Sequence, residues 1–494
     1  MATKKESTHQ LIHRNLTLYQ REHSAARIER RYSKLTATIN VFKLPKGYQI
    51  IYNSKMDLIK IYILISIFFL AGCSKNETTD YSKFKPGIYS EKPPGIGEVS
   101  GSCVGKIALT PNKIKDKLSY PLVYDCQTRK FEILKVPKNI NVSETPVGDL
   151  TFTENGYYLH QSITIDLKRI GRYLIFDNNG NLITEVKYPD LDTHDLILDN
   201  NSFTFIKYIP DRVNAKCFSK NGANLELGIS QKEMNGNSLF DWSSNNQLSV
   251  NWKVSKAEEI NKGKEEDWKK YFRPIRNCYT SFLLKFKYFE TPTLLVSKNN
   301  WALLQLEEND YIHANSIQRI NANGDILVSA RHLDTVFIIN RSNGKVSWTL
   351  GGPYSKMSQN NPNGDPLKGF SHQHSAHIIG DTLVLFDNRN NFPKDASRIV
   401  AYKIDPLNPE KALFKYHFLE PNGKRRPAMG YVSILENNKL VIGWGAVLDQ
   451  DLDSEQRAVS IVGLNSMKEE FFINLLPGWI SYRGKSSMEI KNSH

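Results

Sequence analysis

The sequence of 494 residues lacks several patterns that indicate particular chemistry. It contains only five cysteines, with no CxxC pair and no Cys/His spacing typical of zinc sites, so we expect no metal. It contains no glycine-rich phosphate loop, which argues against the nucleotide-binding folds built on one. Long helical periodicity is nearly absent. We therefore expect no cofactor, and a fold built mainly from strands.

The positive charge of the chain is unevenly distributed. The net charge is +14, and residues 1–55 hold eleven Lys or Arg residues against three Glu. The remainder is only mildly basic, so the charge does not predict a nucleic-acid-binding surface on the folded part. With 40% hydrophobic and 23% charged residues, the chain can bury a large core. We interpret residues 1–55 as a basic extension upstream of the true start codon and assign them no fold.

A second methionine, Met56, opens the segment MDLIKIYILISIFFLAGCSKN. Its apolar run over residues 61–71 is shorter than the roughly 20 residues that span a bilayer, and it suits the hydrophobic region of a signal peptide. The run ends in Leu-Ala-Gly-Cys at Cys73, which resembles the lipobox of bacterial lipoproteins. A hydrophobic core helix is the alternative, disfavoured by the sharp change to polar residues that follows.

After the basic extension, the lipobox divides the chain into two predicted parts. Residues 56–73 are expected to be a lipoprotein signal peptide, and residues 74–494 the mature domain. Cys73 would be acylated and would anchor the protein to a membrane, because several acyl chains give stable attachment. The expected location is the cell envelope, with the domain facing the periplasm or the cell surface.

Four cysteines remain in the mature part, namely Cys103, Cys126, Cys217 and Cys278. Export to an oxidising compartment permits disulfides. The 22 residues between Cys103 and Cys126 suit adjacent strands, so this pair is favoured, although a sequence alone does not fix connectivity.

Short β-rich runs separated by turn signals recur along the mature chain. Asn-Gly dipeptides at positions 179–180, 323–324 and 343–344 predict tight hairpins in which both central residues take positive φ. Four-stranded units repeated every ~40–60 residues are typical of a β-propeller, and the mature chain is long enough for six or seven blades. A pair of β-sandwiches is the alternative.

Two further features of the sequence bear on the propeller prediction. Trp348 and Trp444 are expected in the core between blades, although an aromatic rim for a phenol is the alternative. The charged, helix-prone segment 253–270 interrupts the strand pattern, and we interpret it as a surface excursion rather than a lid.

Six motifs then follow one another in order. They are Asp310–Ser316 (DYIHANS), Ser329–His332 (SARH), Gly344–Gly352 (GKVSWTLGG), Phe370–His374 (FSHQH), Phe386–Asn388 (FDN), and Ser397-Arg398 with Ala401-Tyr402. This order resembles that of the bacterial arylsulfotransferase family over about residues 190–450. The resemblance implies a six-bladed β-propeller that passes a sulfuryl group from a phenolic sulfate ester to another phenol without a nucleotide donor. The family's separate N-terminal β-sandwich is not evident, and residues 74–140 are expected to belong to the first blade.

The resemblance also implies site residues. His313 and His374 would line the central funnel, one polarising the bridging oxygen and the other binding sulfuryl oxygens. The remaining candidates are neutral donors, arginines of family motifs and a His-Asp element, namely Asn315, Gln373, Arg331, Arg389, Arg398 and His194.

Each candidate has a structural alternative. A histidine on a strand can be a buried, hydrogen-bonded core residue, which we consider the better interpretation for His372 and His377. Arg331 can form an inter-blade salt bridge, and Arg398 can brace a loop. Asp387 and Asn388 are interpreted as turn-capping residues rather than as chemical groups.

The chemistry supports this choice of residue types. Transfer of SO₃ needs a nucleophile that can hold the group and release it, which a neutral imidazole nitrogen does. It needs cations or hydrogen-bond donors around three equatorial oxygens, which Arg and protonated His supply. A departing phenolate gains from a general acid such as His.

The family resemblance further implies a late histidine that carries the sulfuryl group transiently. The matching stretch here, Leu440–Gln450, contains no histidine. The role then passes to His374 or His313, or the group passes directly between two bound substrates. The alternative function is a non-catalytic, lipid-anchored propeller that binds an anionic ligand or a partner protein. A glycan-active or quinone-dependent propeller lacks a paired-carboxylate or metal signature.

Overall fold

A computed structural model describes the second of two compact units of the chain. The units are Met1–Thr78 and Thr79–His494. The described residues are 85–113, 116, 118–136, 147–165, 168–188, 190–211, 224–244, 312–351, 364–392, 394–404, 412–447 and 452–490. The predicted basic extension, signal peptide and helix-prone segment lie outside these residues, as do Cys73, Cys217 and Cys278. Over the described ranges no helix is both long and apolar enough to cross a membrane.

Four of the sheets are each built from four consecutive strands joined as antiparallel neighbours. Their strands, sheet by sheet, are β7 (Val147–Thr153), β8 (Gly156–Ile165), β9 (Lys168–Asp177) and β10 (Leu182–Lys187); β11 (Leu191–Leu198), β12 (Ser202–Asp211), β13 (Asn224–Glu233) and β14 (Ser238–Ser243); β15 (Ala314–Arg319), β16 (Ile326–Ala330), β17 (Thr335–Ile339) and β18 (Val346–Gly351); and β19 (His374–Ile379), β20 (Thr382–Asp387), β21 (Arg398–Ile404) and β22 (Ala412–Leu419).

The other two sheets combine strands from both ends of the described chain. One has β23 (Tyr431–Leu435), β24 (Lys439–Gly443), β25 (Gln456–Gly463) and β26 (Lys468–Leu475), with β2 (Ile96–Gly101) at its outer edge. The other has β27 (Trp479–Ser486) beside β3 (Lys106–Lys113), followed by β5 (Leu122–Asp125), β6 (Lys130–Ile133) and β1 (Gly87–Tyr89), with the short β4 (Leu118–Ser119) also paired to β3. In both sheets, strands from the start of the described chain therefore pair with strands from its end, and these two pairings close the ring.

Hydrophobic clusters join each sheet to the next around the ring. One cluster packs β12–β14 against β15–β17, the next packs β16–β18 against β19–β21, and a third packs β20 and β21 against β23–β25. Three more clusters continue through β3, β5 and β27, then β7–β10, and return to β11 and β12. Trp348 and Trp444 lie in these clusters, as predicted.

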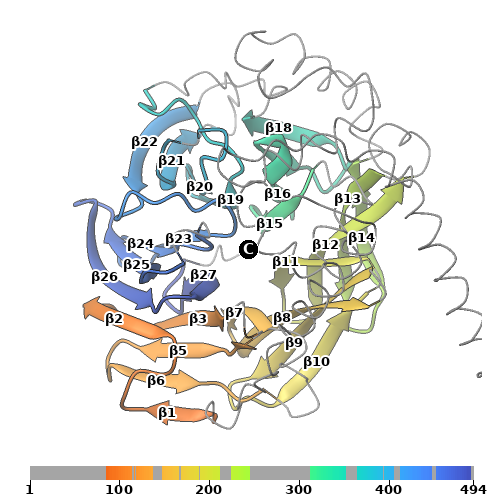
Figure 1. Ribbon diagram of the computed structural model, residues 1–494. Helices are drawn as coiled ribbons and strands as arrows, with labels where there is room; N and C mark the ends of the chain where they lie inside the picture. The colour runs from red at the N-terminus through yellow and green to blue at the C-terminus, as the bar shows by residue number, and fades with distance from the viewer. Residues whose placement is uncertain are drawn as a thin grey trace, which may run out of the picture. The chain divides into compact units, whose positions relative to one another are not determined.

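The six sheets therefore form a six-bladed β-propeller, which confirms the predicted fold (Figure 1). The inner strands are β7, β11, β15, β19, β23 and β27, and Figure 1 shows them nearest the centre of the ring. Residues 87–133 belong to the two closing blades, and the described residues contain no α-helix.

The Asn-Gly turns differ in one detail from the prediction. Hairpins form at all three positions, but only the glycines, Gly180, Gly324 and Gly344, have positive φ. At the first turn, the carboxylate of Asp177 accepts hydrogen bonds from the backbone N–H groups of Asn179 and Asn181. This side-chain bridge supports a longer turn, which needs only one left-handed residue.

Cys103 and Cys126, the pair that the sequence favours, form a disulfide with a Cα–Cα distance of 5.3 Å. Cys103 lies between β2 and β3, and Cys126 follows β5. Since β2 belongs to one closing blade and β3 and β5 belong to the other, the disulfide reinforces the place where the ring closes.

Two glycines allow β27, the innermost strand of its sheet, to approach β24 of the neighbouring blade closely. A Cβ atom built on Gly443 of β24 would lie 2.1 Å from the backbone nitrogen of Gly484 on β27. No side chain fits there, so the two backbones are in direct contact.

Candidate active site

The inner strands are irregular where they approach the axis. The pairing register shifts within β7, β11, β15, β19 and β27. Such bulges leave residues unpaired and redirect their side chains. The residues inside the shifts include Asp149, Asp195, Asn315, Ser375 and Arg483.

Arg483 of β27 joins three other blades at the axis. Its Nη1 donates to Asp149 Oδ2 on β7 and to Asp195 Oδ1 on β11, at 3.1 Å each. Its Nη2 donates to the backbone oxygens of His194 at 2.7 Å and of Asn315, on β15, at 2.8 Å. One buried guanidinium therefore fixes the relative positions of two residues that the sequence predicts in the site.

The charges of this axial cluster compensate one another. Burial alone would raise the pKa of Asp149, but Arg483 and Lys485 hold it below its usual value. Burial alone would lower the pKa of Arg483, but Asp149 and Asp195 raise it well above its usual value. Lys485 Nζ lies 3.1 Å from Asp149 Oδ1. These shifts favour the charged forms of Asp149 and Arg483, so the paired cluster is suited to holding blades rather than to binding an anion.

Two predicted histidines meet beside this cluster. His194 is oriented by Asp192, whose Oδ1 lies 2.5 Å from the His194 Nδ1 and also accepts the His194 backbone N–H. The His194 ring contacts that of His313 edge to face, with 4.7 Å between centroids. His313 has a positive φ of 48°, so its side chain leaves the strand direction just before β15 begins.

Two more histidines extend this row outward. The ring of His332 stacks on His313 at 4.5 Å, and His372 contacts His332 at 6.2 Å. His372 Nδ1 lies 3.1 Å from Asp334 Oδ1. The inner rings are buried and the outer two are half-buried, so the row runs from the protein interior toward solvent. The sequence signal for His332 was its place in the SARH motif, beside Arg331.

His374, at the start of β19, is the most deeply buried of the predicted histidines, with 2% of its surface exposed. Burial lowers its pKa well below the usual value, and the positive charge of Arg331 lowers it further. His194 and His313 act in the same direction, while the hydrogen bond to Asn388 opposes them. His374 is therefore a neutral imidazole at neutral pH, with a guanidinium, His194 and His313 in its surroundings.

Arg331 lies near His374, and its positive charge lowers the pKa of that histidine. Only 6% of the residue is exposed, and its Nη2 donates to the backbone oxygen of Pro427 at 3.1 Å. It stands in the short 3₁₀ turn Arg331–Leu333 that follows β16. The geometry brings together His194, His313, His374 and Arg331.

The two predicted neutral donors make contacts within the protein. The Asn315 amide nitrogen donates to the backbone oxygen of Gln373 at 2.7 Å, while its buried Oδ1 accepts no hydrogen bond from the described residues. The Gln373 amide nitrogen donates to Ser329 Oγ and to the backbone oxygens of Ala330 and Thr335. In this geometry both side chains fasten β19 to the neighbouring blade, and their predicted ligand contacts stay predictions.

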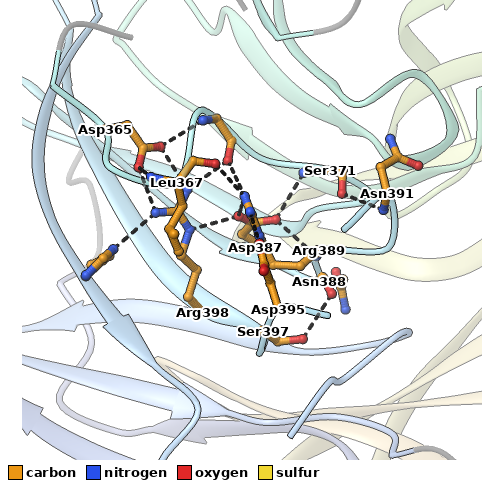
Figure 2. A network of polar contacts seen from close by, with 12 residues as sticks. Asp365, Leu367, Ser371, Asp387, Asn388, Arg389, Asn391, Asp395, Ser397 and Arg398 are labelled. Carbon is orange, nitrogen blue, oxygen red and sulfur yellow. Dashed lines mark hydrogen bonds and ion pairs between the residues drawn. The ribbon is translucent and has the colours of Figure 1, made fainter. Parts of the chain in front are cut away.

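Arg389 and Arg398 lie in a second buried cluster, which Figure 2 shows. Arg398 donates to Asp365 through both Nη atoms at 2.8 Å and to Asp387 Oδ2 through Nε at 2.9 Å. Arg389 donates to the backbone oxygens of Leu367 and Gly369 and pairs with Asp395. Both guanidiniums are engaged within the loops around β20 and β21, which matches the bracing alternative for Arg398.

Sequence reasoning missed the axial residues Arg483, Asp149 and Lys485. One signal was present, because the stretches VGDLTF and THDLIL share an Asp-Leu pair, and both aspartates bind Arg483. The partners lie 334 and 288 positions apart, so only the closed ring brings them together.

Across the described ranges, no group of three or more His, Cys, Asp or Glu side chains is arranged to hold a metal ion. The positive charge of Arg331 near His374 suits an anionic ligand better than a cation.

The fold is a six-bladed propeller, and its candidate site places the buried imidazole of His374 near the Arg331 guanidinium, a combination suited to an anionic ligand. The chain belongs to the arylsulfotransferase (ASST) family, whose model matches residues 113–471. No curated protein matches the chain in sequence.

Solved structures share only a distant likeness. A protein of unknown function from Bacteroides caccae is 10% identical, with 77% of this chain and 99% of that chain covered and a TM-score of 0.36. The periplasmic gluconolactonase PpgL of Pseudomonas aeruginosa is 10% identical, with 78% and 100% covered and a TM-score of 0.37. At these scores neither likeness bears on what this chain does.

Proposed function

We propose that the protein is an aryl sulfotransferase that moves a sulfuryl group from a phenolic sulfate ester to a phenolic acceptor without a nucleotide. The observation that carries this proposal is the buried, neutral imidazole of His374 beside the Arg331 guanidinium. A neutral imidazole is a nucleophile for sulfur, and a fixed cation stabilises the charge that develops on the sulfuryl oxygens. Membership of the arylsulfotransferase family supports the same reaction.

The residues take complementary roles in two half-reactions. A His374 ring nitrogen attacks the sulfur of the donor, the bond between sulfur and the phenolic oxygen breaks, and the phenolate takes a proton from His313 or His194. The acceptor phenol then returns a proton to that histidine, and its oxygen attacks the sulfur and releases His374. Protons and charges balance over the cycle, so no cofactor is needed.

The experiment is a turnover assay of the chain from Ser74 onward with 4-nitrophenyl sulfate and phenol. We expect nitrophenolate release that depends on phenol, and a loss of at least about 100-fold in the His374→Ala variant, the scale of removing a catalytic group. The matched control is His417→Ala on the outer strand β22, which removes the imidazole contacts to Arg398 and Phe414, and activity should persist. No release by the folded protein with several donors would contradict the proposal and favour a binding propeller.

We also propose that the protein is a lipoprotein of the cell envelope, anchored to a membrane through Cys73 and facing the periplasm or the cell surface. The Cys103–Cys126 disulfide supports export, because disulfides persist in oxidising compartments. The test is incorporation of labelled palmitate in cells, with Cys73→Ala beside the unaltered chain. Equal labelling of both would contradict the anchor.

A further inference from the structure

Asn388, which the sequence suggests as a turn cap, lies directly behind His374. It follows β20 and is fully buried. Its side-chain nitrogen donates to the backbone oxygens of Arg426 at 2.6 Å and Met429 at 3.0 Å. An amide whose NH₂ group is engaged by two carbonyl oxygens has its orientation fixed, with the oxygen on the opposite side. That oxygen, Oδ1, lies 2.7 Å from His374 Nδ1.

This contact determines which ring nitrogen of His374 carries the proton. An amide oxygen only accepts hydrogen bonds, so Nδ1 must be the protonated nitrogen. In a neutral imidazole the other nitrogen, Nε2, then keeps its lone pair. Asn388 makes the one hydrogen bond that the described residues give this ring, and Nε2 therefore has no donor holding its lone pair within those ranges.

Asn388 is itself held on both sides by the cluster in Figure 2. Asp387, before it, binds Arg398 at 2.9 Å, and Arg389, after it, is fixed by Leu367 and Gly369. The Ser397 hydroxyl donates to the Asn388 backbone oxygen at 3.0 Å. The buried ion pairs thus hold the backbone that carries Asn388 in place. Besides stabilising the loop, they therefore fix the position of the Asn388 side chain.

We propose that Asn388 is a positioning residue that fixes His374 as the Nδ1–H tautomer and so presents the Nε2 lone pair to the sulfuryl group. The tautomer rests on the contacts alone, and only its use in sulfuryl transfer rests on the proposed function. The charged and titratable side chains near His374 are Arg331, His194 and His313, all of which disfavour its protonation.

The tautomer is tested on the unaltered chain by ¹⁵N NMR with labelled histidine. A His374→Gln variant identifies the His374 resonances by their disappearance. We expect Nδ1 to resonate as a protonated nitrogen and Nε2 as an unprotonated one from pH 6 to pH 8, because the His374 pKa is depressed. A protonated Nε2, or an averaged pair of shifts, would overturn the proposal. This result does not depend on activity or on any variant at Asn388.

The positioning role is tested by the pH dependence of kcat/KM in Asn388→Asp. A carboxylate facing Nδ1–H favours the imidazolium, so the acid limb of the profile should move up by about 1–3 pH units, with activity recovering at higher pH. The matched control is Asn343→Asp in the exposed turn before β18, which should leave the profile unchanged. A uniform loss of activity without a shift would indicate a structural role and overturn the proposal.

The two experiments separate failure of the inference from failure of the proposed function. If the folded protein transfers no sulfuryl group, the NMR result still decides whether Asn388 fixes the tautomer. In the Asn388→Asp variant a carboxylate oxygen would face the carbonyls of Arg426 and Met429. If that variant does not fold, the NMR measurement on the unaltered chain still tests whether Asn388 fixes the tautomer of His374.

Discussion

The axis and the β20–β21 loops each contain a buried arginine that binds two carboxylates, but the two clusters hold different things together. At the axis, Arg483 binds Asp149 and Asp195, so β27, β7 and β11 meet through one side chain. Two backbone oxygens complete the set and add β15. This cluster connects four of the six blades.

The second cluster is local. Arg398 binds Asp365 and Asp387, and all three residues lie between positions 365 and 398. It connects the end of β20 and the start of β21 with the loop that precedes β19. The comparison teaches that the same chemical unit closes the ring in one place and positions a single residue, Asn388, in the other.

The largest effect should come from Arg483→Met. Removal of the guanidinium leaves Asp149 and Asp195 buried without their shared partner, so we expect a loss of about 3–5 kcal/mol in the free energy of unfolding. Urea denaturation measures it, with Lys439→Met at the partly exposed Lys439–Glu470 pair as the control. A change as small as that of the control would show that Arg483 does not hold the ring.

An intermediate effect should come from the double variant Cys103→Ser/Cys126→Ser. The disulfide ties β2 to β3 and β5 across the two closing blades, an outer closure distinct from the hydrogen bonds of Arg483 to β7, β11 and β15, and its loss should cost about 2–4 kcal/mol. We expect the catalytic assay to be unaffected below the melting temperature, because the axial contacts remain. Loss of activity in the still folded variant would mean that the outer closure also positions the site.

The smallest effect concerns the local cluster at low pH. Burial alone would raise the pKa of Asp365, but Arg398 and further hydrogen bonds lower it from 3.8 to about 2. A lowered carboxyl pKa contributes stability above the unfolded pKa, and this contribution is lost as the pH falls toward 2. The difference in unfolding free energy between the unaltered chain and Asp365→Asn should therefore shrink by about 2 kcal/mol between pH 4.5 and pH 2. A constant difference would contradict the pairing.

Much of the fold could be predicted because its signals are local. Turn residues, alternating strands and two interior tryptophans predicted the blades. The family motifs predicted that His313, His374 and Arg331 belong to one site. The mixed composition of the two closing blades was not visible, because β2 and β26 pair across more than 350 positions.

The rest of the site depends on backbone irregularity and long-range contacts. A register shift in β27 exposes Arg483 to the axis, and no local pattern encodes where a strand bulges. The sequence suggests Asn388 as a turn cap, but its side chain instead contacts His374 and the backbone oxygens of Arg426 and Met429. The contact to His374 depends on how β19 and β20 pair. Leu440–Gln450 contains no histidine, and we propose that His374 makes the attack instead.

The central claim is that His374 receives the sulfuryl group, and the most direct measurement traces that group. The protein would be mixed with ³⁵S-labelled 4-nitrophenyl sulfate without acceptor, quenched in alkali, digested and analysed by peptide mass spectrometry. The account predicts label on the peptide that contains His374, and its release when phenol is added before the quench. Phenol-dependent turnover with no label on His374 would contradict the account and indicate direct transfer or another nucleophile.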